Sequence, residues 1–387
     1  MKPRRSVLAS LALAAALVAL LATGLPLGLA SSGSTRADSP LKKACGARVS
    51  VQTDWFPSAE RGYLYQLAGL NGTLDKQKGR YSGQIGKTGV QFEIRSGGPF
   101  SGFQQPISQM YQDPTITLAV ATSDEQIQLS KKLPLVSIVA PQEFSPQIVM
   151  WNPEKLTINN WNDVRKSGAT VLVFAGGVWI DYLVNRGFVS KGQVDTSYDG
   201  SPTRFVTSGG GIVQQGFVSG EPFQYANDIE QYKGKQIKFL LISSSGYVPY
   251  PQTIAVRKSE LKSKAACWKL LVPLIQKAQL DYFANPLPVN QKIEAVVKEM
   301  ATFWQLSPAL DAYAVRSMKT YKIVQNGPNC TIGDFSMKRL QGVVNQLLPI
   351  YESKGLDTFD PGLKAGAVAT NQFIDPKLGF KTAKCKK

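Results

Sequence analysis

The complete absence of histidine limits the chemistry open to this 387-residue chain. Without histidine the chain cannot build a Ser-His-Asp or Cys-His nucleophilic site, nor the histidine-containing zinc sites of most hydrolases. Acid-base chemistry would then fall to carboxyl groups, and Asp54 with Glu221 is the pair that we weigh for it. Nothing in the sequence requires such a pair to act, so binding is favoured over catalysis and no cofactor is expected.

Two short motifs imitate catalytic signatures without completing them. Gly86-Lys87-Thr88 matches the end of a phosphate-binding loop, but Tyr81 occupies the position of the opening glycine, so we interpret the segment as a turn. Ser259 and Lys262 have the spacing found in penicillin-recognising enzymes, and Lys87-Thr88-Gly89 supplies a second element of that set. The two elements stand in the reverse order along this chain, so we interpret both as chance matches.

A group of aromatic residues beside an aspartate is the strongest candidate for ligand recognition. Trp55, Phe56 and Tyr63 could offer flat faces to an aromatic or heterocyclic ligand. Asp54 could supply a fixed hydrogen-bond acceptor beside them. The competing interpretation places Trp55 and Phe56 in the hydrophobic core. We favour the binding role for Trp55 because it follows a predicted strand, whereas Phe56 suits either role.

Two glycine pairs, Gly97-Gly98 and Gly176-Gly177, each lie between a predicted strand and a predicted helix. At such positions the lack of a side chain lets backbone amides at a helix start approach a carboxylate, a sulfonate or a polar ring edge. A tight turn would need glycine as well. Trp179 follows the second pair, and it either closes over the ligand or packs its helix onto the sheet.

Three further residues complete the predicted binding site. Glu221 lies at a predicted strand end with Tyr225 close behind it, and together they could bind a polar or cationic edge. A surface salt bridge is the alternative for Glu221. Asp124 is either an acceptor for the ligand or the N-cap of its helix, and we favour the cap.

Alternating strands and helices must position these residues. Strands are predicted at 49–52, 90–94, 116–120, 135–140, 148–151 and 171–174, with helical segments between several of them. This alternation predicts α/β layers with mostly parallel sheets, in which the loops behind strand ends hold the ligand. Amphipathic helices are predicted at 265–283, 289–305 and 336–352, so the C-terminal third is mainly helical.

The segment from Gln52 to Tyr65, with its Asp-Trp-Phe-Pro core, resembles the opening of a family of ABC-importer binding proteins. That family includes the binding proteins for the thiamine pyrimidine precursor, nitrate, sulfonates and taurine. The likeness continues at the two glycine pairs, at 134–136 with Gln142 and Pro146, and through 216–223. It covers residues 48–258 well and the helical remainder loosely.

The resemblance implies a type II periplasmic-binding-protein fold, an α/β fold with a ligand cleft between two lobes. One lobe would combine residues 46–141 with 251–387, the other would be 142–250, and two crossings would form the hinge. The implied function is a monomeric solute-binding protein that captures a small heterocyclic, sulfonate-like or amine ligand and docks on an ABC permease in the membrane. An envelope sensor or interaction protein on the same fold is the alternative.

One departure from the family concerns the ligand. Members that bind the thiamine precursor usually carry a histidine after the Asp-Trp-Phe-Pro core, where this chain has Glu60-Arg61. A related fungal enzyme consumes its own histidine and a bound pyridoxal phosphate to make that precursor. A chain without histidine cannot carry out that reaction.

The N-terminal 37 residues have the composition of a secretory signal. Lys2, Arg4 and Arg5 precede an apolar run from Val7 to Leu25, and small residues around Ala30 and Ala37 offer cleavage positions. We therefore expect an extracytoplasmic protein, in the periplasm or on the outer face of the cell membrane, with an uncleaved anchor as the alternative. The paired arginines also resemble a twin-arginine signal, but an ordinary basic segment is favoured.

Charge and cysteine content agree with export. The net charge of the whole chain is +17, and removing residues 1–37 takes away four basic residues and no acidic ones, which leaves +13. The lysines are scattered, so nucleic-acid binding is not expected. The four cysteines fit no zinc pattern, and no metal site is expected. Two disulfides are predicted, and of the three pairings we favour Cys267 with Cys330 and Cys45 with Cys385.

Overall fold

A computed structural model of the chain describes residues 38–385. The predicted signal segment at 1–37 lies outside the described residues. Among residues 38–385, no helix combines the length and the apolar character needed to cross a bilayer. These residues belong to one compact unit with mixed α/β structure.

The first of two sheets has seven strands in the order β2-β3-β4-β1-β5-β12-β6. Its core is the parallel set β4-β1-β5, and all four described side chains of β5 are buried. The strands are β1 Arg48–Gln52, β2 Thr73–Asp75, β3 Arg80–Gln84, β4 Gln91–Arg95, β5 Leu118–Ala121, β6 Leu135–Val139 and β12 Thr253–Arg257.

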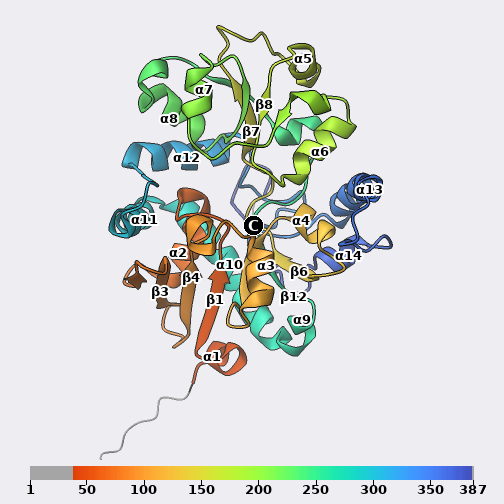
Figure 1. The fold of residues 1–387 in the computed structure, drawn as a ribbon. Coiled ribbons are helices and arrows are strands. Elements are labelled where there is room, and N and C mark those ends of the chain that lie inside the picture. Colours follow the sequence, from red (N-terminus) through yellow and green to blue (C-terminus); the bar gives the residue numbers. More distant parts are fainter. Residues whose placement is uncertain (1–37, 386–387) are drawn as a thin grey trace, which may run out of the picture. The chain divides into compact units, whose positions relative to one another are not determined.

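The second sheet has five strands in the order β11-β7-β10-β8-β9. Figure 1 shows the strands of the two sheets in separate halves of the picture, with β7 and β8 in the upper half and β1 and β4 in the lower half. The strands are β7 Gln147–Trp151, β8 Val171–Leu172, β9 Val194–Asp195, β10 Val213–Phe217 and β11 Lys238–Leu241. The chain therefore passes between the sheets twice, once between β6 and β7 and once between β11 and β12.

The predicted α/β layers are confirmed, but the expectation of mostly parallel sheets is wrong. Parallel pairing is confined to β4-β1-β5 in the first sheet and to β10-β8-β9 in the second. Antiparallel pairing joins β12 to both its neighbours and β7 to both of its own. Strands β7 and β12 each follow a crossing between the sheets, and the consecutive strands β2, β3 and β4 pair antiparallel as well. The predicted lobe boundaries, 46–141 with 251–387 and 142–250, stay a prediction.

Helices cover the sheets, and the long ones lie in the C-terminal third as predicted. The helices are α1 Pro40–Cys45, α2 Gly62–Ala68, α3 Pro106–Gln112, α4 Ser123–Gln128, α5 Trp161–Lys166, α6 Val178–Asn185, α7 Thr203–Thr207, α8 Glu221–Asn227, α9 Glu260–Ser263, α10 Ala265–Ala284, α11 Leu287–Met300, α12 Pro308–Thr320, α13 Met337–Ser353 and α14 Ala365–Val368. The helix predicted at 289–305 ends at Met300, because Ala301 takes a left-handed conformation with φ of 52°.

Two helices of the C-terminal third contact elements from both halves of the fold. Helix α13 packs against α4 beside the first sheet and against α6 beside the second, and Lys354 pairs with Asp181 at 2.7 Å. Its buried side chains recur at the three- and four-residue spacing of one helix face, which was visible in the sequence. Helix α12 contacts both α8 and the short 3-10 helix Ala59–Arg61. The C-terminal third therefore joins the two halves as well as covering the first sheet.

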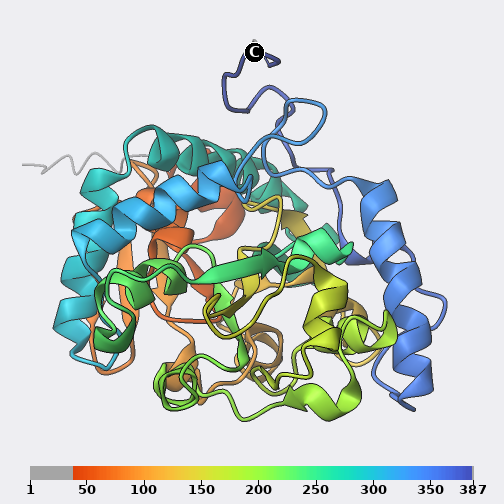
Figure 2. The same ribbon diagram turned by 90° about the horizontal axis from the view of Figure 1, so that it is seen from above.

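Two disulfides are present, but the favoured pairing is wrong. Cys45 bonds to Cys267 and Cys330 bonds to Cys385. The reason for the first is that α1, which ends at Cys45, packs against α10, where Cys267 lies in the first turns. The reason for the second is that the C-terminal segment runs beside the loop that contains Cys330, as the bond from the Ile332 amide to the Leu378 carbonyl shows. In Figure 2 the C-terminal segment projects from the top of the molecule.

One arginine of α13 holds both crossings between the sheets. Arg339 Nη2 donates to the Glu143 carbonyl at 2.7 Å, and Nη1 donates to the Glu143 carboxylate at 2.8 Å. Its Nε donates to the Val248 carbonyl at 2.7 Å, and Nη2 also reaches the Pro249 carbonyl at 3.1 Å. Glu143 lies on the first crossing, whereas Val248 and Pro249 lie on the return crossing. We call Arg339 and these partners the crossing clamp.

Two aromatic rings contact the guanidinium and complete the crossing clamp. The Arg339 Cζ atom lies 4.6 Å from the Phe144 ring centroid and 4.0 Å from that of Tyr250. Such cation-π contacts strengthen when the cation is removed from water, and the Arg339 side chain is only 13% exposed. The planar, multidentate guanidinium is what allows one side chain to satisfy two crossings at once.

Replacing the clamp arginine should destabilise the protein. Arg339→Met leaves the Glu143 carboxylate and three carbonyls without their donor, so we expect the free energy of unfolding to fall by roughly 3 kcal/mol. Urea unfolding followed by circular dichroism measures it. Lys338→Met, on the exposed face of the same helix, is the control and should change stability by less than about 0.5 kcal/mol. An Arg339→Met loss no larger than the control would contradict the clamp.

Candidate functional site

The loop after β1 carries the predicted Asp54 and Trp55 and is tied to the loop after β4. The Gly97 amide donates to the Trp55 carbonyl at 3.0 Å, and the Gly98 amide donates to the Asp54 carbonyl at 3.2 Å. A Cβ atom on Gly97 would lie 2.4 Å from the Asp54 carbonyl carbon. The first glycine pair is thus required for close approach of two loops. The expectation that these two amides face a ligand is corrected, because both are engaged by the backbone.

A buried arginine holds Asp54 in place. The Arg61 side chain is 4% exposed, and its Nε donates to Asp54 Oδ1 at 3.0 Å while Nη1 donates to Ser58 Oγ at 2.9 Å. Burial by itself lowers the pKa of Arg61, but Asp54 and Glu60 outweigh it and the pKa is raised. The Asp54 side chain remains 42% exposed, so one of its edges is open to a partner. Arg61 was not among the predicted site residues.

Trp55 lies among aromatic rings from both halves of the fold. Its ring centroid is 6.2 Å from Phe103 and 6.1 Å from Trp304, and it is 6.4 Å from Phe174. Phe174 follows β8 of the second sheet, so the contact joins the loops of the two sheets. The ring centroids of Phe174 and Tyr198 are in turn 4.7 Å apart. The side chain of Phe103 is 65% exposed, which leaves apolar ring surface accessible beside Trp55.

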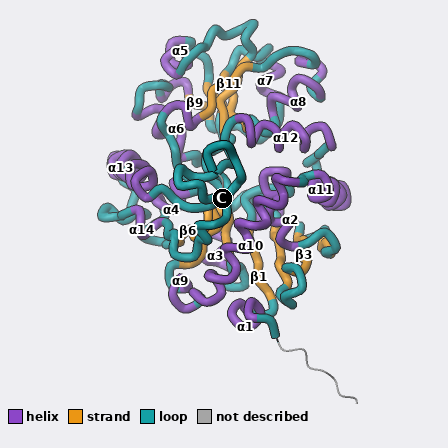
Figure 3. The backbone as a smooth tube through the Cα atoms, turned by 180° about the vertical axis from the view of Figure 1, so that it is seen from behind, coloured by secondary structure: helices purple, strands orange, loops and turns teal. Residues whose placement is uncertain are grey.

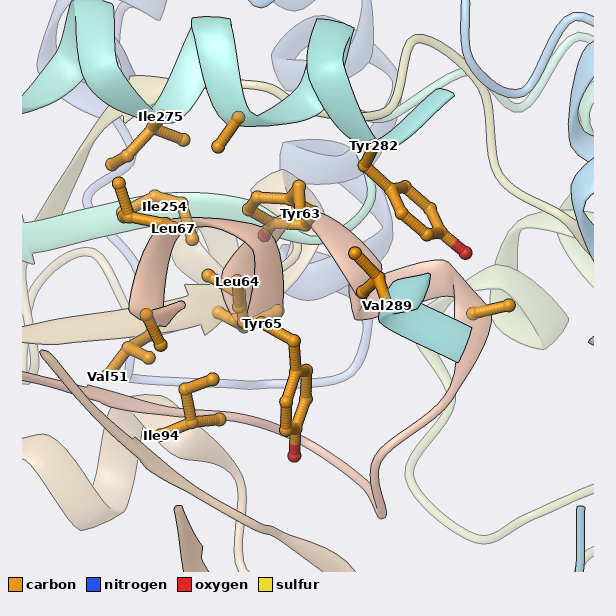
Figure 4. Packing of buried hydrophobic residues seen from close by; sticks show 14 of the residues in the cluster. Val51, Tyr63, Leu64, Tyr65, Leu67, Ile94, Ile254, Ile275, Tyr282 and Val289 are labelled. Atoms are coloured by element: carbon orange, nitrogen blue, oxygen red, sulfur yellow. The ribbon is translucent and has the colours of Figure 1, made fainter. Parts of the chain in front are cut away.

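The other two predicted aromatic residues are packed inside the protein. Phe56 is fully buried and stacks on Trp304 with centroids 5.9 Å apart and planes at 4°. Tyr63 is fully buried on α2, and Figure 4 shows it in the packed core with Ile275 and Tyr282 of α10. Neither ring offers an exposed face in this structure. Phe56 and Tyr63 are therefore near Trp55 in the sequence, but both make packing contacts in the core.

Glu60 links the loop after β1 to the second sheet by a hydrogen bond. Ser219 Oγ, which follows β10 in the second sheet, donates to Glu60 Oε1. Gln252 Nε2, on the return crossing, donates to Glu60 Oε2 at 3.3 Å, and Gln142 Nε2 on the first crossing donates to Gln252 Oε1 at 3.2 Å. Sequence reasoning missed Glu60 as a site residue. Its position where the family carries histidine was the available signal.

Glu221 follows β10 of the second sheet and lies close enough to Glu60 for the two charges to interact. It begins α8, and its Oε2 accepts a hydrogen bond from the Phe217 amide at 2.7 Å. Burial raises the pKa of Glu221 to about 7, the Phe217 amide opposes the rise, and the charge of Glu60 adds to it. Tyr225, predicted beside it, is 3% exposed and accepts from Gln214 Nε2 at 2.9 Å in the core of its sheet.

The helix after β5 contributes another carboxyl group. Thr122, rather than Asp124, is the N-cap of α4, because its Oγ1 accepts the Glu125 amide; the favoured cap role for Asp124 is thus wrong. Asp124 Oδ2 accepts instead from the buried Tyr247 hydroxyl. Burial, with the charges of Asp124 and Asp54, raises the pKa of Glu125 to about 8. Glu125 was missed by sequence reasoning, although it is adjacent to a predicted residue.

The second glycine pair precedes α6 as predicted. Gly176 has φ of 80°, which favours glycine, and Gly177 is the N-cap of α6 without a side-chain cap. Trp179 is 5% exposed, and a Cβ atom on Gly177 would lie 2.7 Å from its Nε1 atom. Trp179 therefore packs its helix into the sheet's core in this structure. The exposed Gly176 belongs to the same loop as Phe174, close to the Trp55 contact.

Together these loops form a negatively charged, aromatic junction between the sheets, which we call the acidic junction. It comprises Asp54, Glu60, Glu125, Glu221, Arg61, Trp55 and Phe174. Among residues 38–385, Arg61 is the only cation in an ion pair with these four carboxyl groups. Within the same residues no cluster of three or more His, Cys, Asp or Glu side chains has the geometry of a metal site. The site can therefore offer carboxylates and ring faces to a ligand.

Two α/β sheets joined by two crossings give this chain the type II periplasmic-binding-protein fold. The aliphatic sulphonate binding protein of Escherichia coli superposes with a TM-score of 0.54 at 10% identity, covering 80% of this chain and 88% of its own. The alkanesulfonate-binding protein of Xanthomonas axonopodis pv. citri, bound to MOPS, gives 0.53 at 9% identity, covering 84% and 99%. A zinc-bound ligand-binding component of an ABC-type import system from Staphylococcus aureus gives 0.51 at 10%, covering 84% and 97%.

No protein-family model matches the sequence. No curated protein matches it either. The likeness to the solved structures is therefore one of fold, and the ligand must be argued from this chain's own residues.

The raised pKa values predict how stability depends on pH. Glu125 and Glu221 bind protons more tightly in the folded protein than in the unfolded chain, where their pKa is near 4.5. Stability should therefore fall as pH rises from about 5 to about 8. Each pKa unit corresponds to about 1.4 kcal/mol at most. Thermal unfolding between pH 5 and pH 9 measures this fall in stability. Asp311 also contributes to it, because burial raises the pKa of Asp311 to about 8.

The double variant Glu125→Gln/Glu221→Gln should lose clearly less stability over that pH range than the unmodified protein. Glu154→Gln, at an exposed position, is the control and should leave the pH dependence unchanged. If the double variant follows the same pH curve as the unmodified protein, these two carboxyl groups do not have raised pKa values.

Proposed function

We propose that this protein is the extracytoplasmic solute-binding component of an ABC importer and that it captures a small organic molecule at the acidic junction. The observation that supports it most is the meeting of loops from both sheets, at the Glu60–Ser219 hydrogen bond and the Trp55–Phe174 ring contact. A ligand held by both sets of loops would favour the closed arrangement of the lobes. The closed protein would then dock, as a monomer, on a permease in the membrane.

The charges of the acidic junction favour a cationic ligand over a sulfonate. The acidic junction contains four carboxyl groups, and the guanidinium of Arg61 is already engaged by Asp54 and Glu60. A sulfonate would meet repulsion from the carboxylates and find no free cation among the junction residues. An organic cation would satisfy the open edge of Asp54 and the carboxyls of Glu125 and Glu221. The exposed rings beside Trp55 suit a flat or quaternary-ammonium body.

A carboxylate-dependent enzyme is the second candidate, and the raised pKa of Glu221 is the observation that favours it. A carboxyl group that stays protonated near pH 7 can act as a general acid. The partner expected from sequence, Asp54, is however fixed by Arg61, and the carboxyl that acts on Glu221 is Glu60. Glu60 is itself engaged by Ser219 and Gln252. Binding therefore explains more of the geometry than catalysis does.

The cationic-ligand proposal predicts selective and pH-dependent binding. Benzyltrimethylammonium, whose charge does not change with pH, should bind measurably in isothermal titration calorimetry, and benzenesulfonate of similar size should not. Its affinity should rise by about tenfold from pH 5.5 to pH 8.5, because Glu125 and Glu221 lose their protons over that range. Preferential binding of benzenesulfonate, or an affinity that falls with rising pH, would argue against the proposal.

Neutralising Glu60 should weaken cation binding. Glu60→Gln keeps the shape of the side chain and a hydrogen-bonding oxygen for Ser219 but removes the charge, so we expect about tenfold weaker binding of benzyltrimethylammonium. Circular dichroism of the variant checks that it folds. Glu154→Gln on the exposed surface is the matched control and should bind with unchanged affinity. Turnover of the bound cation into product by the unmodified protein would favour the enzyme instead.

A further inference from the structure

A cavity lies away from the acidic junction, against the crossing clamp. Its volume is about 670 Å³, within the range of small-molecule sites. It is lined by the first crossing at Glu143 and Phe144, by Arg339, by residues that follow α12, and by the C-terminal segment from Phe380 to Cys385. In the view from behind, the C-terminal segment lies at the centre of the picture (Figure 3). None of the residues that form the acidic junction lines this cavity.

The charge at this cavity is opposite to that of the acidic junction. Lys319, Lys322 and Lys384 all line it. Among the residues that the structure describes, none of these three lysines is in an ion pair, and the cavity's Glu143 carboxylate is taken by Arg339 at 2.8 Å. Lys319 Nζ donates to the Phe283 carbonyl at 3.0 Å, which fixes its ammonium group at the cavity wall. The cavity therefore presents a surplus of positive charge.

The remaining walls of the cavity are largely apolar. The rings of Phe144, Phe283 and Phe380 and the side chain of Val324 line it. Phe283 and Phe380 are in edge contact, with centroids 6.1 Å apart, so the aromatic wall is continuous from α10 to the C-terminal segment. The Cys330–Cys385 disulfide and the bonds between Asn326 and Phe380 hold that segment in position. The apolar wall is thus built from elements that are linked together.

We propose that this cavity is a second binding site, which takes an organic carboxylate with an aliphatic or aromatic body. The lysine ammonium groups would bind the carboxylate, and the aromatic walls would remove the apolar body from water. The ligand class is opposite in charge to that of the acidic junction, so the site goes beyond solute capture there. Because Glu143, Phe144 and Arg339 form part of its wall, an occupant would lie directly against the crossing clamp.

Calorimetric titration of the purified protein with octanoate tests this second site. Octanoate should bind saturably, whereas octanol should bind at least about tenfold more weakly and octylammonium should not bind here. A saturating concentration of benzyltrimethylammonium should leave the octanoate affinity unchanged, because the two ligands occupy different sites. Absence of octanoate binding, equal binding of octanol, or displacement of octanoate by the cation would each overturn the proposal.

Lysine variants locate the binding. The double variant Lys322→Gln/Lys384→Gln removes two charges from the cavity wall and should weaken octanoate binding by about tenfold. Lys269→Gln, an exposed lysine on α10 outside the cavity, is the matched control and should leave the octanoate affinity unchanged. All these lysines are exposed, so the variants should fold, which a thermal melt checks. Equal weakening by the control would show that octanoate responds to overall charge, and would overturn the assignment.

Discussion

The arrangement of the two sheets depends on the contacts that Arg339 makes with both crossings. A single guanidinium binds carbonyls of Glu143, Val248 and Pro249, and it also contacts the rings of Phe144 and Tyr250. The crossings are the two chain segments by which the sheets are covalently joined, so fixing them fixes where the strand ends of one sheet face those of the other. Helices α12 and α13, which contact both halves, reinforce this arrangement.

The loops that meet as a consequence carry a charge opposite to that of the whole chain. The chain has a net charge of +17, yet Asp54, Glu60, Glu125 and Glu221 gather where loops of both sheets meet. Burial of these carboxyl groups, together with repulsion from neighbouring carboxylates, is unfavourable in the free protein, and the raised pKa values of Glu125 and Glu221 express that cost. A ligand cation would relieve the repulsion, so the same feature that weakens the empty site would strengthen binding.

Sequence alone predicted the fold better than the site. Strands such as β1 and β5 and the face of α13 were visible as local patterns, and the Asp-Trp-Phe-Pro segment pointed to the fold. Strand direction, disulfide pairing and the role of Glu60 depend on contacts between residues far apart in the chain, such as Glu60 with Ser219. Tyr63 and Tyr225 illustrate the same limit. The sequence pattern around an aromatic residue near a strand end is the same whether its ring faces a ligand or the core, and both of these rings are buried.

The ligand class is the central claim, and mass spectrometry of the small molecules released from protein purified out of its native cell envelope tests it most directly. The protein would be captured without denaturation, washed, and then unfolded to release what it holds. The charges of the acidic junction predict a stoichiometric organic cation, an amine or a positively charged heterocycle, that rebinds the emptied protein and is not retained by Glu60→Gln. A stoichiometric sulfonate or other organic anion that is retained by Glu60→Gln and lost on Arg61→Gln would contradict it.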